Sequence, residues 1–251
     1  MSRHLAIVPA YNESASIAAT IADLREHAPG FDVLVVDDGS TDDTARVARS
    51  HGAAVIRHPF NLGIGGAVQS GYQYALDDDY EIAVQFDGDG QHDARYIAKL
   101  LGHLRANPEL NMVTGSRFLE EDGEGYKSSA SRRLGIRLFG RMLSAVVGAP
   151  VTDPTSGFRM VDRRGIELFA RDYPHDYPEV EAVLLLHFHR LRSAEVPVQM
   201  RARVAGVSSI NASRSIYYMV KVSLAIFVGL LRARPAVEAG DAAPITAEHS
   251  I

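Results

Sequence analysis

The chain has 251 residues, of which 46% are hydrophobic and 23% charged, and this composition predicts a globular protein of one or two domains rather than a disordered chain. The net charge of −5 argues against a general nucleic-acid-binding protein, which needs a basic face to neutralise phosphates. The absence of cysteine excludes disulfides, thiolate zinc sites, iron–sulfur clusters and cysteine nucleophiles, and it fits a reducing compartment. The first residues lack the order of regions that a signal peptide has, so we expect none.

The first half of the chain alternates between short apolar runs and helical patterns. Four apolar runs, each bounded by turn residues, predict strands at 5–8, 33–36, 53–56 and 82–86. The helical patterns cover about 12–28, a stretch that starts near 40, then 66–76 and 93–105. Strands without polar alternation, separated by helices, predict an α/β protein whose parallel sheet is covered on both faces. Ligands of such sheets bind at the carboxyl ends of the strands.

The second half is less regular. The predicted elements are a strand at 111–114, a loop at 120–131, a helix at 132–147 and a late strand at 195–200. Pro197 places the late strand at a sheet edge or makes it end there. Acidic residues gather in the first 93 positions, whereas arginine dominates from Arg117 to Arg203. Such a distribution suits a metal in one half and an anion in the other, although solvated faces also explain it.

Two carboxylates follow the predicted strand at 82–86. Asp87 and Asp89, separated by Gly88, can bind one hard divalent cation together with phosphate oxygens. An acidic turn is the alternative interpretation. An EF-hand loop is excluded, because His92 and Ala98 stand where that loop needs glycine and glutamate.

A second acidic motif follows the strand at 33–36. Ser40 or Thr41 can cap the next helix, but capping does not explain the two carboxylates Asp37 and Asp38 before Gly39. These carboxylates can accept hydrogen bonds from a base or a ribose.

A glycine-rich loop at 61–66 precedes the third helix. Its backbone N–H groups can meet an anion, and a plain tight loop explains it equally well. The dinucleotide-binding fingerprint is not satisfied, since Val68 stands at its third glycine. The sequence also lacks the G-x-S-x-G pattern of a serine nucleophile.

Four motifs at the predicted strand ends occur in a characteristic order. They are Pro9-Ala10-Tyr11-Asn12-Glu13, the run from Asp37 to Asp42, Asn61-x-Gly63, and the run from Asp87 to His92. Together they resemble the family 2 glycosyltransferases, which have the GT-A fold. Within that family the chain is similar to the dolichyl-phosphate mannose synthase and polyprenyl-phosphate glycosyltransferase branch, through residues 115–118, the arginine-rich helix and residues 153–159. The resemblance covers about residues 4–232.

The resemblance implies an α/β GT-A fold, with a mostly parallel sheet, helices on both faces and an additional C-terminal apolar helix. It implies a glycosyltransferase domain at 1–212, a membrane-interfacial or partner-docking helix at 213–234 and a disordered tail at 235–251.

The same resemblance assigns candidate site residues. The nucleotide-sugar site would comprise Pro9, Tyr11, Glu13, Asp37, Asp38, Gly39, Asn61, Gly65, Asp87, Gly88 and Asp89. Asp87 and Asp89, with Gln91, would bind Mg²⁺ or Mn²⁺. The acceptor phosphate would contact Arg117, Arg132, Arg133, Ser156 and Arg159, because arginine donates forked hydrogen bonds to phosphate. The implied catalytic residues are Asp89, Arg117 and Arg133.

The implied reaction is the inverting, metal-dependent transfer of a hexose from a UDP- or GDP-linked sugar to polyprenyl phosphate, giving a lipid-linked sugar for envelope glycan or glycoprotein synthesis. Relatives that glycosylate hydroxyls carry a Glu-Asp pair, which is missing from residues 177–181. A phosphate acceptor is already an anion and needs no base. Glu179 or Glu181 remains a candidate base, and a hydroxyl acceptor, a non-catalytic nucleotide-sugar-binding protein and a nucleotidyltransferase remain alternatives.

A lipid acceptor requires contact with a membrane. The apolar run 216–231 has 16 residues, or about 24 Å as a helix, and a spanning helix needs about 20 apolar residues. We therefore expect an interfacial helix, or one that docks a small membrane-protein partner, with Arg232 and Arg234 near lipid headgroups. A buried core helix is the alternative. The expected location is the cytoplasmic face of the membrane.

Overall fold

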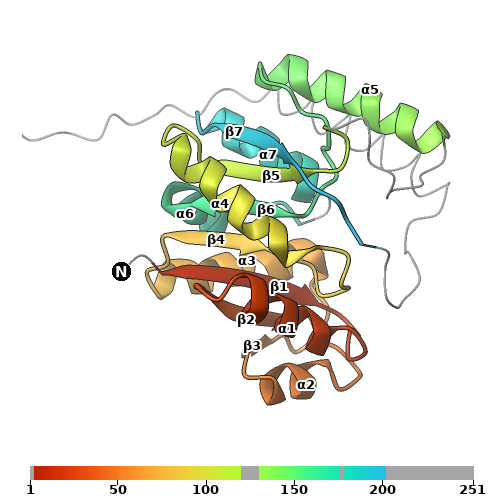
Figure 1. Cartoon of the computed structure of the whole chain (residues 1–251), viewed down its shortest axis with the longest axis vertical. Coiled ribbons are helices and arrows are strands. Elements are labelled where there is room, and N and C mark those ends of the chain that lie inside the picture. Colours follow the sequence, from red (N-terminus) through yellow and green to blue (C-terminus); the bar gives the residue numbers. More distant parts are fainter. Residues whose placement is uncertain (1–2, 120–129, 176–177, 202–251) are drawn as a thin grey trace, which may run out of the picture.

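A seven-stranded sheet organises the computed structural model, which describes residues 3–119, 130–175 and 178–201 (Figure 1). The strands are β1 (His4–Ala10), β2 (Phe31–Asp37), β3 (Ala54–Arg57), β4 (Ile82–Gln85), β5 (Met112–Ser116), β6 (Arg159–Asp162) and β7 (Ser193–Pro197). The helices are α1 (Ile17–His27), α2 (Thr44–Ser50), α3 (Gly63–Asp77), the 3₁₀ helix η1 (Ala94–Tyr96), α4 (Ile97–Ala106), α5 (Ala130–Val147), α6 (Arg163–Arg171) and α7 (Pro178–Phe188). The strand order is β3-β2-β1-β4-β6-β5-β7.

The sheet is mostly parallel, as predicted. Strand β1 pairs in parallel with β2 and β4, β2 with β3, and β5 with β7. Only β6 runs antiparallel to its neighbours β4 and β5. Pairing of Ala10 with Asp37 and of Ile7 with Gln85 brings the carboxyl ends of β1, β2 and β4 to one edge.

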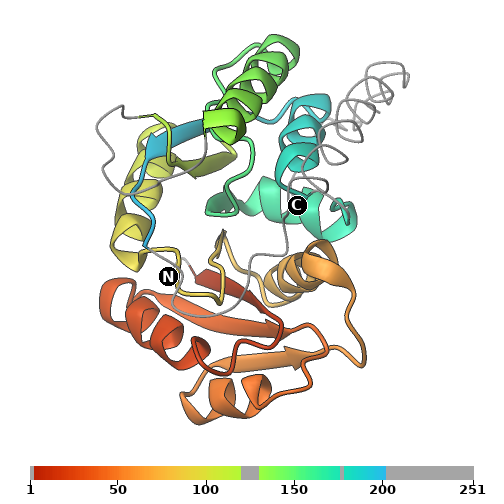
Figure 2. The same cartoon turned by 90° about the vertical axis from the view of Figure 1, so that its right-hand side faces the viewer.

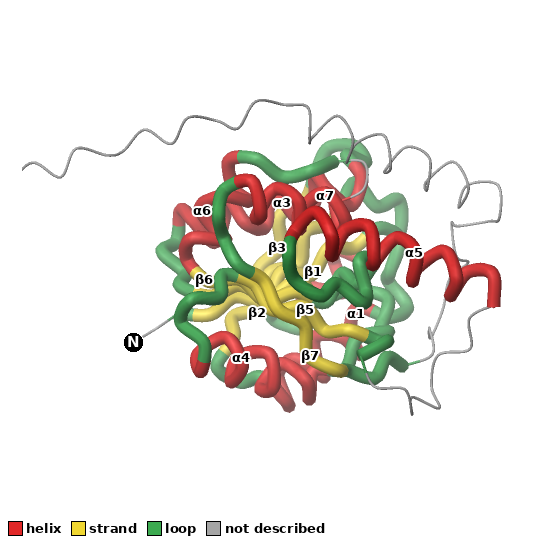
Figure 3. The backbone as a smooth tube through the Cα atoms, turned by 90° about the horizontal axis from the view of Figure 1, so that it is seen from above, coloured by secondary structure: helices red, strands yellow, loops and turns green. Residues whose placement is uncertain are grey.

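Helices cover both faces, which also confirms the prediction. Leu5 and Ile7 of β1 belong to a core cluster with α3, α6 and α7, while Ala6 and Val8 belong to a second cluster with α1, α2 and α4. Figure 3 shows the strands between these two layers, and Figure 2 shows the same elements turned. Both faces of β1 are buried, so its apolar run shows no polar alternation.

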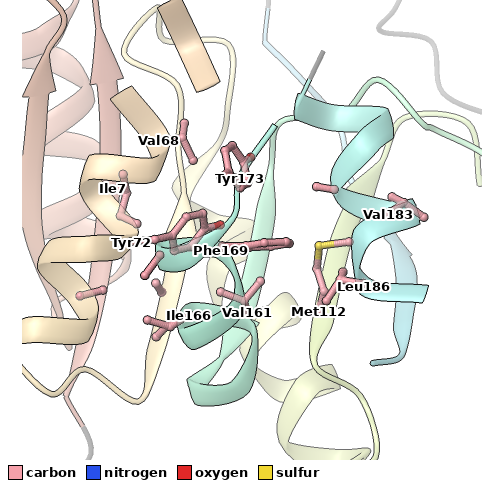
Figure 4. Close-up of a cluster of buried hydrophobic side chains, with 14 of the residues drawn as sticks. Ile7, Val68, Tyr72, Met112, Val161, Ile166, Phe169, Tyr173, Val183 and Leu186 are labelled. Atoms are coloured by element: carbon pink, nitrogen blue, oxygen red, sulfur yellow. The ribbon is translucent and has the colours of Figure 1, made fainter. Parts of the chain in front are cut away.

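Helix α3 packs unusually close to the sheet. A methyl group on Gly71 would overlap Cγ2 of Ile7, so the absence of a side chain lets the helix approach β1. Next to Gly71, Tyr72 contacts Phe169 of α6 at 5.2 Å between ring centroids (Figure 4). This packing fixes the N-terminus of α3 at the carboxyl edge of the sheet.

The second half departs from the sequence predictions in several places. The predicted helix at 132–147 is α5, and Pro197 does end the edge strand β7. Strand β6 and helices α6 and α7 were not predicted. The predicted units at 213–234 and 235–251 lie outside the described residues. Within the described part of the chain, no helix has the length and hydropathy needed to cross a membrane.

Candidate active site

Two loops at the carboxyl edge are joined by side-chain hydrogen bonds. The N–H of Asn12 donates to Oγ of Ser40 at 2.9 Å, and Oδ1 of Asn12 accepts from the N–H of Thr41 at 2.9 Å. The N–H of Glu13 donates to Oγ1 of Thr44 at 2.9 Å. Asn12 has φ of 56°, a left-handed conformation that asparagine tolerates. These hydrogen bonds therefore hold the loops after β1 and β2 together at the carboxyl edge of the sheet.

Three residues predicted to bind the nucleotide-sugar lie at the end of β1 and in the loop that follows it. Tyr11 is 48% exposed, which is high for a large aromatic side chain. The carboxylate of Glu13 accepts a hydrogen bond from Oγ of Ser16 at 2.6 Å. Pro9, also predicted, is buried at the end of β1. Of these three residues Tyr11 is the most exposed, Glu13 is partly buried and Pro9 is buried.

Asp37 is a buried carboxylate paired with Arg57. Its Oδ1 accepts from the N–H of Ser40 at 3.0 Å. Its Oδ2 lies 3.2 Å from Nε of Arg57 but accepts no hydrogen bond from the residues that the structure describes. An open hollow nearby is lined by Gly39, Ser40, Thr41, Arg57, His58 and Pro59. Gly39 has φ of +73°, and a Cβ there would lie 2.6 Å from the backbone carbon of Phe60, so glycine is required.

Asp38 binds protein groups with both oxygens. Oδ1 accepts from the N–H of Leu62 and from Nδ1 of His58, each at 2.8 Å, and Oδ2 accepts from the N–H of Gly63 at 2.9 Å. Nε2 of the same His58 is hydrogen-bonded to Oγ of Ser70 at 2.9 Å. Asp38 thus holds the loop before α3 in place, and its predicted contact with the donor stays a prediction.

The predicted residues of that loop are also placed. The Oδ1 of Asn61 accepts from the N–H of Gly63 at 3.0 Å. A Cβ on Gly65 would overlap the carbonyl oxygen of Pro174. Gly65 therefore lets α3 contact the segment that follows α6, and its donor contact is untested.

The side chain of Asp87 is 35% exposed. Its backbone N–H donates to Nδ1 of His92 at 3.0 Å, and Nε2 of this histidine is 3.5 Å from Oδ2 of Asp87. His92 is buried and stacks on Phe158, with ring centroids 4.9 Å apart. His92 therefore anchors the acidic loop (residues 87–92) against the buried ring of Phe158.

Asp89 is more buried than Asp87. Its Oδ1 accepts from the N–H of Gln91 at 3.0 Å, and the residue is 6% exposed. The carbonyl of Gly88 accepts from Oγ of Ser16 at 2.8 Å, which ties the acidic loop to the start of α1.

Asp87 and Asp89 suit a divalent cation that is shared with a substrate. Among the described residues, no group of three or more His, Asp or Glu side chains is arranged to hold a metal ion by itself. Mg²⁺ is typically bound by one or two carboxylates plus substrate phosphates. Two neighbouring carboxylates, of which Asp87 is 35% exposed and Asp89 6%, fit that pattern.

The side chain of Arg117 is paired inside the protein. Nε and Nη2 donate to the two oxygens of Asp153, each at 2.7 Å, and Nη2 also donates to Oγ1 of Thr155 at 2.7 Å. The Arg117 and Asp153 side chains are 11% and 0% exposed. The guanidinium fork predicted for the acceptor phosphate therefore faces Asp153 in this structure.

Arg159 and Ser156 also make internal contacts. Arg159 is 1% exposed, and its Nε donates to the carbonyl of Ser156 at 2.9 Å. Its other nitrogens donate to the carbonyls of Pro178 and Glu179 at the start of α7. Oγ of Ser156 donates to the carbonyl of Gly115 at 2.6 Å. A phosphate contact at either residue stays a prediction.

The remaining candidates on the acceptor side are Arg132, Arg133 and Glu179. Arg132 and Arg133 lie in α5, but their side chains fall outside what the structure describes. Glu179, the candidate base, is partly buried at the start of α7. Burial raises the pKa of Glu179, the charge of Arg159 lowers it, and the carboxylate of Asp87 raises it further. Glu179 is thus electrostatically coupled to the acidic loop.

Comparisons with known proteins agree with this architecture. The chain is 31% identical to the undecaprenyl-phosphate mannosyltransferase of Micrococcus luteus, over 83% of this chain and 88% of that protein. It is 28% identical to a UDP-N-acetylglucosamine–dolichyl-phosphate N-acetylglucosaminyltransferase of Methanococcus voltae, over 77% and 83% of the two chains.

A solved structure has the same fold. It is glucosyl-3-phosphoglycerate synthase from Mycobacterium tuberculosis, crystallised with Mn²⁺, UDP and glucosyl-3-phosphoglycerate. The TM-score is 0.66 at 22% identity, over 90% of this chain and 79% of that one. The model of glycosyl transferase family 2 matches residues 5–169, more than half of the chain. The chain therefore belongs to glycosyl transferase family 2 and is a glycosyltransferase.

Proposed function

We propose that this glycosyltransferase moves a hexose from a UDP- or GDP-linked sugar to polyprenyl phosphate, with inversion at the anomeric carbon. The observation that carries the proposal is the acceptor shared by two relatives. One is named for transfer of mannose and the other for transfer of N-acetylglucosamine, yet both are named for transfer to a polyprenyl-type phosphate. The sugar varies between them while the acceptor class is constant.

The donor half of the site supports this proposal. Asp37 would accept a hydrogen bond from the nucleobase or ribose; its buried Oδ2 lies 3.2 Å from Nε of Arg57, which lines the open hollow at Gly39. Asp87 and Asp89 would hold Mg²⁺ or Mn²⁺ together with the donor diphosphate. When bound, the cation acts as a Lewis acid that stabilises the departing nucleoside diphosphate.

The acceptor half is proposed from chemistry. Polyprenyl phosphate is an anion at neutral pH, so its oxygen needs no base to attack the anomeric carbon. Arg132 and Arg133 would orient that phosphate. The proposed setting is the cytoplasmic face of a membrane, reached through the apolar run 216–231 or through a small membrane-protein partner.

A second candidate is transfer to a hydroxyl group. The observation that favours it is the raised pKa of Glu179, which burial moves toward the range of a general base. A hydroxyl acceptor would need such a base, whereas a phosphate acceptor would not.

The decisive experiment incubates the protein with polyprenyl phosphate, Mg²⁺ or Mn²⁺, and a panel of UDP- and GDP-sugars. We expect one donor to yield a lipid-linked sugar, and Asp89→Ala to abolish that product. Transfer to free sugars alone, lost in Glu179→Gln, would establish the second candidate instead. Donor hydrolysis without any transfer would refute both, and full turnover by Asp89→Ala would refute the metal-assisted mechanism.

A further inference from the structure

Arg201, which follows β7, makes a bridge that the proposed function does not use. Its Nη1 and Nη2 donate to the two carboxylate oxygens of Asp23 on α1, at 3.0 and 3.1 Å. Nη2 also lies 2.9 Å from Oδ1 of Asp93, which directly follows the acidic loop. Figures 1 and 2 show this segment, in blue, crossing from β7 toward the loop that precedes α4.

The backbone of Arg201 contacts the same loop. Its N–H donates to the carbonyl of Gln91 at 2.8 Å. The N–H of Gln91 in turn donates to Oδ1 of Asp89 at 3.0 Å. Arg201 is therefore two hydrogen bonds away from a carboxylate that is proposed to bind metal.

The acidic loop needs such external support. Asp89 stands between Gly88 and Gly90, and Gly90 has φ of 76°. Glycine confers the greatest backbone freedom, so contacts from other elements restrict this turn: Oγ of Ser16 donates to the carbonyl of Gly88, and the N–H of Arg201 donates to that of Gln91. The acidic partners of Arg201 are well buried, since the side chains of Asp23 and Asp93 are 13% and 4% exposed. Arg201 itself is 40% exposed, so solvent screens the pair in part, but its two hydrogen bonds to a buried carboxylate make it stronger than a fully exposed ion pair.

We propose that Arg201 is a positioning residue for the metal and diphosphate site. It clamps the loop of Asp89 against α1, so that the carboxylate is already oriented before donor and metal bind. The inference rests on the proposed role of Asp89 in metal binding. Residues that orient a metal ligand without touching the metal typically change metal affinity by about 10- to 100-fold.

The test measures Mn²⁺ binding without turnover. Mn²⁺ is titrated into the full chain in saturating UDP and, separately, saturating GDP, and free Mn²⁺ is followed by electron paramagnetic resonance. Arg201→Gln keeps the backbone hydrogen bond to Gln91 and removes the guanidinium contacts with Asp23 and Asp93, so it should raise the Kd for Mn²⁺ about 5- to 10-fold, at or just below the lower limit of the usual range. Arg201→Lys should give a smaller rise, since lysine keeps the charge but lacks the fork.

Arg46→Gln is the matched control. Arg46 also pairs with an aspartate, but on the exposed surface of α2, where the two side chains are 71% and 62% exposed. Its Mn²⁺ Kd should stay within about twofold of wild type, as expected for a surface pair. Urea midpoints of all variants identify any that fail to fold.

Asp23→Asn tests the same bridge from its other end. If one clamp is responsible, the double variant with Arg201→Gln should bind Mn²⁺ no more weakly than the weaker single variant. Unchanged Mn²⁺ affinity in folded Arg201→Gln, or an additive double variant, would overturn the inference and leave the proposed transfer standing. Wild-type protein that binds Mn²⁺ and nucleotide but makes no lipid-linked sugar would refute the proposed acceptor and leave the clamp intact.

Discussion

The pairing of Arg117 with Asp153 yields a quantitative prediction for Arg117→Met. The substitution removes two hydrogen bonds of 2.7 Å from a carboxylate whose side chain is fully buried. Breaking a buried ion pair from one side costs about 3–5 kcal/mol, because the remaining charge is left unpaired. Asp153 keeps hydrogen bonds from the Arg117 N–H and from Oγ1 of Thr155, both at 3.1 Å. We therefore expect the lower end, a loss of about 3 kcal/mol in the free energy of unfolding.

The assay is urea denaturation. With a slope of about 2–3 kcal/mol per molar urea, the midpoint should fall by about 1–1.5 M. Adding Asp153→Asn to Arg117→Met should restore part of the loss, because it removes the unpaired charge. Arg117→Met that unfolds at the wild-type midpoint while losing sugar transfer would refute this reasoning, and would mean that the guanidinium acts on a ligand.

Two further predictions concern stability. Gly71→Ala should destabilise the fold by about 1–3 kcal/mol, because its Cβ would clash with Ile7 of β1. Gly102→Ala should stabilise α4 by about 0.5–1 kcal/mol, because a Cβ there meets nothing within 4 Å. Urea midpoints equal to that of wild type would contradict both predictions. Burial, which raises the pKa of Asp42, is outweighed by hydrogen bonds from Thr44 and Ser14 that lower it to about 2. A lowered pKa stabilises the fold above about pH 4 and loses that contribution as the pH falls toward 2. Asp42→Asn should therefore flatten the fall of the urea midpoint in this window, and parallel curves for variant and wild type would exclude the effect.

The first half of the fold was predictable because three of its strands, β1, β2 and β4, are largely buried on both faces. Their apolar runs are continuous, and turn residues mark where each one ends. Strand β6 has no such signal, since its four residues begin with Arg159 and end with Asp162. A buried arginine there is stable only because the carbonyls of Ser156 and of the distant Pro178 and Glu179 accept its hydrogen bonds. No local pattern shows a partner that folding brings from another element.

The candidate site likewise has a part that the sequence predicts and a part that depends on tertiary packing. The sequence locates Asp37, Asp87 and Asp89, because strand ends in a parallel sheet meet at one edge. It does not show that Asp38 is held by His58, nor that His58 is hydrogen-bonded to Ser70 in the middle of α3. These contacts depend on the packing of α3 against β1, which the spacing of residues along the chain does not specify.

The internal partners of Arg117 and Arg159 distinguish these two residues from the other arginines predicted to bind the acceptor phosphate. The sequence separates early carboxylates from later arginines, which suggests a metal on one side and a phosphate on the other. An arginine binds phosphate through a fork of parallel N–H groups, and in Arg117 the fork of Nε and Nη2 already faces Asp153. Arg159 directs its nitrogens to three backbone carbonyls. Because phosphate binding by Arg117 or Arg159 would replace these internal hydrogen bonds, we propose Arg132 and Arg133 first, and a phosphate contact at Arg117 or Arg159 stays a prediction.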